Sequence, residues 1–119
     1  MLYTLLYQPN VRALVLIGSS GPKHQTAKPP ENIGLSSMER FMVETVWLTP
    51  FDVVDELKNI HVPTLILAGG KDPRLEVARL MHSNIPASTL KVIEGYGHEM
   101  TVDSVKLCVD EIPYWLEKI

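Results

Sequence analysis

Apolar residues along the chain gather in three short runs, each closely followed by glycine. The runs are Val11–Ile17 (VRALVLI), Val62–Ala68 (VPTLILA) and Thr89–Ile93 (TLKVI). Each run has the length and the Val, Ile and Leu content of a β-strand. The first two runs are almost wholly apolar, which is typical of strands that are covered on both faces of a parallel sheet.

Between and after these runs, apolar residues recur at the spacing of an α-helix. The helical stripes cover residues 2–7, 38–48, 75–85 and 102–119. Pro86 ends the third stripe, because proline cannot continue a helix. Pro113 lies inside the last stripe, where we expect a kink or a fresh turn.

Alternating strands and helices predict an α/β fold. We expect one domain over residues 1–119, with a three-stranded parallel sheet in the order 11–17, 62–68, 89–94 and flanking helices. Residues 22–50 contain several prolines and begin without an apolar period. We interpret this segment as a loop or a short cap-like insertion within the domain.

The composition of the chain excludes some classes of function and some classes of partner. The chain has 119 residues, of which 45% are hydrophobic and 21% are charged, so it has an ordinary globular composition. The net charge is −3 and no basic patch is present, so we expect no nucleic-acid partner. Cys108 is the single cysteine, which fits a reducing compartment, and we expect a cytoplasmic protein.

A membrane span, a signal peptide, and a metal or other cofactor are also not expected. The longest apolar run, residues 13–17, is far too short for a membrane span, and the N-terminus lacks the basic region of a signal peptide. His24, His61 and His82 have no companions at metal-ligand spacing, so we expect neither a metal nor another cofactor.

Candidate chemistry lies where the strands end, because an open α/β sheet binds ligands at the carboxyl edge of its strands. Lys71-Asp72 follows the second run, and His98 follows the third after Gly95-Tyr96-Gly97. A carboxylate on one strand end can orient a histidine on the next and stabilise its protonated form. Asp72 could instead serve only as the N-cap of the helix that begins near Pro73.

These local sequences resemble the α/β-hydrolase family. Residues 57–72 (LKNIHVPTLILAGGKD) are similar to its penultimate core strand and acidic triad residue, and residues 89–98 (TLKVIEGYGH) to its last core strand and catalytic histidine. Residues 1–17 resemble the helix behind the nucleophile and the strand that follows. The resemblance implies the C-terminal half of an esterase-like serine hydrolase, with Asp72 and His98 as catalytic residues.

One part of the family pattern is missing from the sequence. The nucleophile of such hydrolases stands in Gly-x-Ser-x-Gly, and no such motif occurs in these 119 residues. Ser19 and Ser20 follow the first strand, but that position lies one strand away from the family's nucleophile. We therefore expect a chain that is inactive alone, with the serine supplied from elsewhere, for example by an N-terminal hydrolase half in trans.

An alternative is a non-catalytic module that forms oligomers or binds small hydrophobic molecules. The strand at 11–17 would form an unpaired apolar edge, which is a site for pairing with another chain. We expect a homodimer or higher oligomer joined through this edge or through swapped segments.

Overall fold

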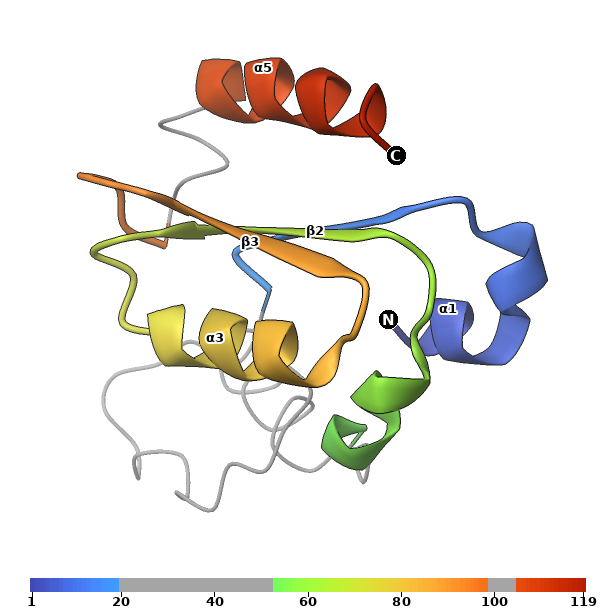
Figure 1. Cartoon of the computed structure of the whole chain (residues 1–119). Helices are drawn as coiled ribbons and strands as arrows, with labels where there is room; N and C mark the ends of the chain where they lie inside the picture. The colour runs from blue at the N-terminus through green and yellow to red at the C-terminus, as the bar shows by residue number, and fades with distance from the viewer. Residues whose placement is uncertain (20–52, 99–104) are drawn as a thin grey trace, which may run out of the picture.

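A computed structural model of the chain describes residues 1–19, 53–98 and 105–119. The predicted helix at 38–48 and the segment 22–50 lie outside these residues. The chain begins with helix α1 (Leu2–Tyr7) and the 3₁₀ turn η1 (Gln8–Asn10). The other elements, shown in Figure 1, are β1 (Leu14–Ile17), η2 (Val54–Asn59), β2 (Thr64–Gly69), α3 (Leu75–Asn84), β3 (Ser88–Ile93) and α5 (Val105–Leu116).

The three strands form one parallel sheet in the order β1-β2-β3, which confirms the predicted fold class and strand order. Leu14 is opposite Thr64, and Thr64 is opposite Ser88, so the three strands start level with one another. Their carboxyl ends consequently meet at one edge of the sheet, where the predicted site residues follow.

Helical segments cover both faces of the sheet. In Figure 1, α5 lies on one face, while α3, η2 and α1 lie on the other. The central strand β2 has all six residues buried, and its side chains alternate between the two layers. Ile66 and Ala68 pack toward α3 and η2, whereas Leu65 and Leu67 pack toward α5.

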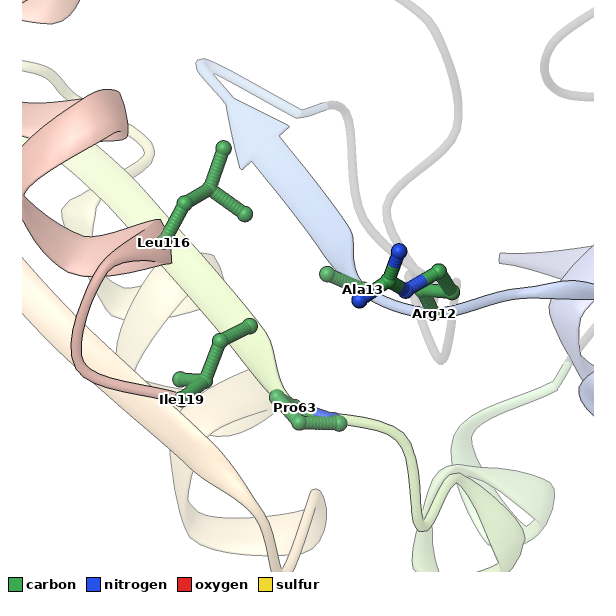
Figure 2. A pocket seen from close by; sticks show the side chains of 5 residues that line it. All are labelled: Arg12, Ala13, Pro63, Leu116 and Ile119. Atoms are coloured by element: carbon green, nitrogen blue, oxygen red, sulfur yellow. The ribbon is translucent and has the colours of Figure 1, made fainter.

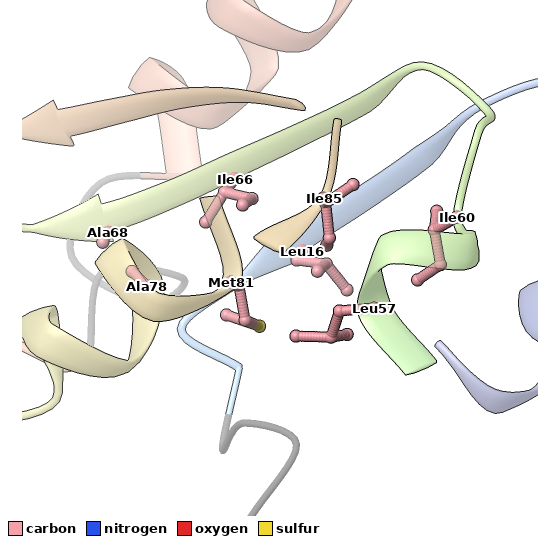
Figure 3. Close-up of a cluster of buried hydrophobic side chains, with 8 residues drawn as sticks. All are labelled: Leu16, Leu57, Ile60, Ile66, Ala68, Ala78, Met81 and Ile85. Atoms are coloured by element: carbon pink, nitrogen blue, oxygen red, sulfur yellow. The ribbon is translucent and has the colours of Figure 1, made fainter. Parts of the chain in front are cut away.

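The larger of the two cores lies on the α3 side. Figure 3 shows its eight side chains, which β1, β2, η2 and the α3 segment contribute: Leu16, Leu57, Ile60, Ile66, Ala68, Ala78, Met81 and Ile85. The smaller core on the α5 side includes Cys108, which is buried as its place on an apolar helical stripe predicts.

One prediction about the bounds of an element is wrong. The first strand is shorter than the run 11–17, because the N–H of Val11 is bound to the carbonyl of Gln8 and the ladder begins at Leu14. Of the two outcomes expected at Pro113, a fresh turn does not occur, since helix α5 continues through this residue. Pro113 has no N–H, so the helix lacks the hydrogen bond to the carbonyl of Val109.

The described helices are all short. None of those in residues 1–19, 53–98 and 105–119 has the length and apolar character that crossing a bilayer requires.

Candidate active site

The loops after β2 and β3 are bound to each other by their backbones. The N–H of Gly70 donates to the carbonyl of Ile93, and the N–H of Lys71 donates to the carbonyl of Tyr96, each at 2.9 Å. These bonds extend the β2–β3 contact beyond the ladder. As a result the two loops form one surface at the carboxyl edge of the sheet.

Gly69 permits this close approach. A Cβ atom at position 69 would stand 2.3 Å from the carbonyl oxygen of Tyr96 and 2.4 Å from that of Gly97. Both atoms belong to backbone, so neither can swing aside. Gly95 has a different role, because its φ of +85° is a left-handed conformation that glycine adopts without strain.

Asp72 and His98 meet on this surface. The Nδ1 atom of His98 lies 3.0 Å from Oδ2 of Asp72, within hydrogen-bond distance. The Asp72 side chain is only 4% exposed, whereas the His98 side chain is 43% exposed. The carboxylate is therefore enclosed, and the imidazole reaches from it toward solvent.

The other carboxylate oxygen of Asp72 is held by backbone. Its Oδ1 atom accepts the N–H of Arg74 at 2.7 Å, two residues further along the chain. Asp72 is thus part of a turn that precedes α3. The alternative role of Asp72 as the N-cap of that helix is not borne out, since the N-cap position is Arg74. The Asp-Pro-Arg sequence, which favours such a turn, was the available signal for this contact.

The charge state of Asp72 follows from these contacts. Burial opposes ionisation and raises the pKa, but the Arg74 N–H, the His98 hydrogen bond and their charges together outweigh it. The net result is that the pKa of Asp72 lies below its ordinary value. An ionised carboxylate can only accept hydrogen bonds, so Nδ1 of His98 must carry the shared proton. In the neutral ring, Nε2 then keeps a free lone pair.

Comparison with solved structures shows which known fold the sheet and its helices resemble. An α/β-hydrolase enzyme from the metagenome of sediments from the lagoon of Mar Chica, Morocco, aligns with a TM-score of 0.72 and 23% identity, over 98% of this chain and 55% of its own. A serine hydrolase involved in carbazole degradation aligns with a TM-score of 0.74 and 19% identity, over 98% of this chain and 58% of its own. This chain has part of the α/β-hydrolase fold.

A shorter alignment has higher identity. A thermophilic esterase from Thermogutta terrifontis is 32% identical over 59% of this chain and 26% of its own, with a TM-score of 0.53. No protein-family profile matches the sequence, and no curated protein matches it. The chain spans little more than half the length of the α/β-hydrolase structures that cover it almost completely.

One further residue adjoins the pair in this α/β-hydrolase fold. Gly18 follows β1, and a Cβ atom there would stand 3.8 Å from Cε1 of His98, so the end of β1 borders the imidazole. Ser19 is half-buried and makes no hydrogen bond to His98 within the described part of the chain. Ser20 lies outside the described residues. Along the sequence, Gly18 is recognisable only as the glycine that follows the first apolar run, because its contact with His98 depends on how β1 is placed beside the loop after β3.

Two of the three other histidines, His61 and His82, are among the described residues. His61 and His82 are exposed, and His82 is paired with Ser88 at 2.9 Å. His24 lies outside the described residues. Among the residues that the structure describes, no group of three or more His, Cys, Asp or Glu side chains could hold a metal ion.

The hollows of this α/β-hydrolase fold include two that lie away from the pair. One, of about 470 Å³, is lined by residues at the starts of β1 and β2 and at the end of α5. Figure 2 shows its side chains, with Leu116 and Ile119 on one side and Arg12, Ala13 and Pro63 on the other. The second hollow lies on the β3 side of the same helix end.

Proposed function

We propose that Asp72 and His98 are the acid and the base of a Ser-His-Asp triad in an esterase-like serine hydrolase. The single observation that supports this most is their hydrogen bond, in which a buried carboxylate holds a half-exposed imidazole. In this arrangement Asp72 fixes the tautomer of His98 and stabilises the imidazolium that forms when His98 accepts a proton.

The reaction follows from the free Nε2 atom. His98 takes the proton of a serine hydroxyl, and the serine oxygen attacks the acyl carbonyl to form an acyl-enzyme. The alcohol leaves with a proton from the imidazolium. Water then gives a proton to His98, attacks the acyl carbon and releases the acid, so the serine is regenerated. No cofactor enters these steps.

The proposed serine comes from outside these 119 residues. No Gly-x-Ser-x-Gly motif is present, and Ser19 has no hydrogen bond to His98 in the described structure. We infer that the triad is completed by an N-terminal hydrolase segment, either joined to this chain or supplied in trans. The single, buried Cys108 is consistent with a reducing cytoplasmic setting for such a protein.

A chimera tests this proposal. The part of the Mar Chica enzyme that aligns with this chain would be replaced by residues 1–119, and hydrolysis of p-nitrophenyl acetate would be measured. We expect activity that falls by about 10³-fold or more in His98→Ala, because triad members act as a unit. His82→Ala, which changes a histidine outside the pair, should leave the activity unchanged.

The unmodified chain provides a second test of the proposed function. A fluorophosphonate probe followed by intact-mass measurement should give no adduct on the chain alone. A His98-dependent adduct on Ser19 or Ser20 would overturn the external serine while keeping the pair. An active chimera whose activity survives His98→Ala would overturn the triad assignment itself.

A second candidate is a non-catalytic module that assembles through its exposed apolar surface. Large apolar side chains on α1 are exposed, including Tyr3, Leu6 and Tyr7, and none of the described residues pairs with the outer edge of β1. We propose that this edge mediates a homodimer or higher oligomer when no hydrolase segment covers it.

A further inference from the structure

One flank of helix α5 is apolar and exposed. Val109 is 58% exposed and Leu116 is 45% exposed. They are seven residues apart, as are the buried Cys108 and Trp115, so each pair lies along one line of the helix. Adjacent residues are about 100° apart around a helix, which places the exposed pair roughly a quarter turn from the line that faces the sheet. Such a flank is suited to packing against a second helix.

This flank points toward the open edge of β1. Leu116 lines the hollow of about 470 Å³ together with Ala13 and Pro63, which come just before β1 and β2. Figure 2 shows the Leu116 side chain extending from α5 toward β1. The opposite flank is charged, because Glu111 pairs there with Lys91 of β3. The apolar flank therefore lies on the side where no described strand adjoins β1.

A second copy of this chain does not cover the flank. Helix α5 packs over the central strand β2, against Leu65 and Leu67. A copy that paired with β1 through either of its own edge strands would place its α5 three strand spacings away, which is about 14 Å. Packed helices have axes only about 8–10 Å apart. The flank consequently stays open in a homodimer formed through the β1 edge.

A helix that accompanies an added strand does reach the flank. A strand paired with the outer edge of β1 lies two strand spacings from β2, which is about 10 Å. A helix packed over that strand has its axis at this distance from α5, as helices in contact do. The α/β-hydrolase fold has chain to supply such a unit, because this chain covers only 55% and 58% of two solved structures.

We propose that Val109 and Leu116 form the docking face for a helix of the hydrolase segment, whose preceding or following strand pairs with the outer edge of β1. The inference rests on the proposed function, since this is the segment that supplies the serine. The docked helix presents an apolar stripe to the flank and polar residues to solvent. The spacing of α5 from the edge thus selects an added strand and helix over a second copy.

Cysteine labelling in two proteins tests this proposal. Val109→Cys and Tyr114→Cys are each made in the native chain and in the chimera with the Mar Chica enzyme, and their reaction with N-ethylmaleimide is followed by intact mass. Tyr114 is the matched control, because it is 56% exposed and lies on the β3 side of α5. The unsubstituted native chain and chimera give the background, which includes the buried Cys108.

We expect both variants of the native chain to be labelled readily. In the chimera, the labelling of Val109→Cys should slow by about tenfold or more, while that of Tyr114→Cys stays unchanged. Each variant is compared with itself, which removes differences in thiol pKa between the two positions. Equal rates for Val109→Cys in the native chain and in a folded chimera overturn the proposal.

The native chain tests the proposal even without the chimera, because docking requires an open flank. Slow labelling of Val109→Cys at about 1 μM means that another part of this chain covers the flank, and slowing only at about 100 μM means that a second copy does. Either result overturns the proposal.

Hydrolysis by the chimera separates this inference from the proposed function. Protection of Val109→Cys in a chimera without activity supports the docking face and counts against the triad. Activity that depends on His98, without protection of Val109→Cys, supports the triad and overturns the docking face.

Discussion

Asp72 shows how one side chain serves two contacts. Its Oδ1 accepts the Arg74 N–H and its Oδ2 faces Nδ1 of His98. In Asp72→Asn the amide oxygen can keep the first contact, but the NH₂ group turns a donor toward Nδ1. We expect the neutral imidazole to move its proton to Nε2, visible as exchanged ¹⁵N shifts of the two ring nitrogens. Asp110→Asn, at an exposed position of α5, is the control.

The lowered pKa of Asp72 predicts that the free energy of unfolding depends on pH. The pKa of Asp72 is lower in the folded state than in the unfolded one, so protons bind preferentially to the unfolded state as the pH falls. The contribution is complete above the ordinary aspartate pKa and is lost as the pH drops through the folded-state value.

Urea unfolding of the native chain and Asp72→Asn at several pH values measures this contribution. The difference in unfolding free energy should shrink as the pH falls below the ordinary aspartate pKa, where Asp72 takes up a proton. A difference that grows over this acid range would show that the sign is wrong.

Substitutions at Gly69 and Gly95 distinguish the cost of a steric clash from the cost of a strained backbone conformation. Gly69→Ala places a methyl group against two backbone carbonyl oxygens, so we expect a loss of about 2–4 kcal/mol and a displaced His98 loop. The methyl group of Gly95→Ala meets no atom within 4 Å. We expect this variant to lose only about 1–2 kcal/mol of stability, because alanine is strained at the positive φ of this position. Thermal unfolding and the His98 ring shifts compare them, and equal effects would contradict the steric argument.

At the level of elements, Pro113 is a local weakness in α5. It is exposed inside the helix and lacks the N–H that would bind the carbonyl of Val109. We expect Pro113→Ala to stabilise the chain by roughly 1–3 kcal/mol in urea unfolding. Unchanged or lower stability would show that the break in the ladder is relieved by another contact.

The helices and strands also show how much of the fold and of the candidate site can be predicted from the sequence. Short apolar runs that are closely followed by glycine located all three strands, and the paired loop residues Asp72 and His98 were named from their places after β2 and β3. The 3₁₀ turn η2 was missed, because Leu57 and Ile60 are too few to show a helical period. The Gly69 contact was missed too, since it depends on backbone register between residues distant in sequence.

At the scale of the whole molecule, we expect the outer edge of β1 to mediate association with a second chain. The N–H groups of Leu14 and Gly18 donate to the β2 side, so by alternation that of Val15 points to the open edge. Val15→Pro removes an edge donor without removing a β1–β2 bond.

Light scattering during size-exclusion chromatography measures the effect. We expect the native chain to be a dimer or larger at micromolar concentration and Val15→Pro to shift toward monomer. Leu6→Ser, on the exposed face of α1, separates edge pairing from general apolar association. A monomeric native chain would contradict the edge proposal.

The backbone bonds between the loops after β2 and β3 have an evolutionary consequence. The hydrogen bonds that join the loops of Asp72 and His98 to each other all lie within one continuous stretch, from Thr64 to His98. A recombination event that moved this stretch would carry an aligned acid and histidine together. Lineages could then exchange or lose a nucleophile without having to reinvent its partners.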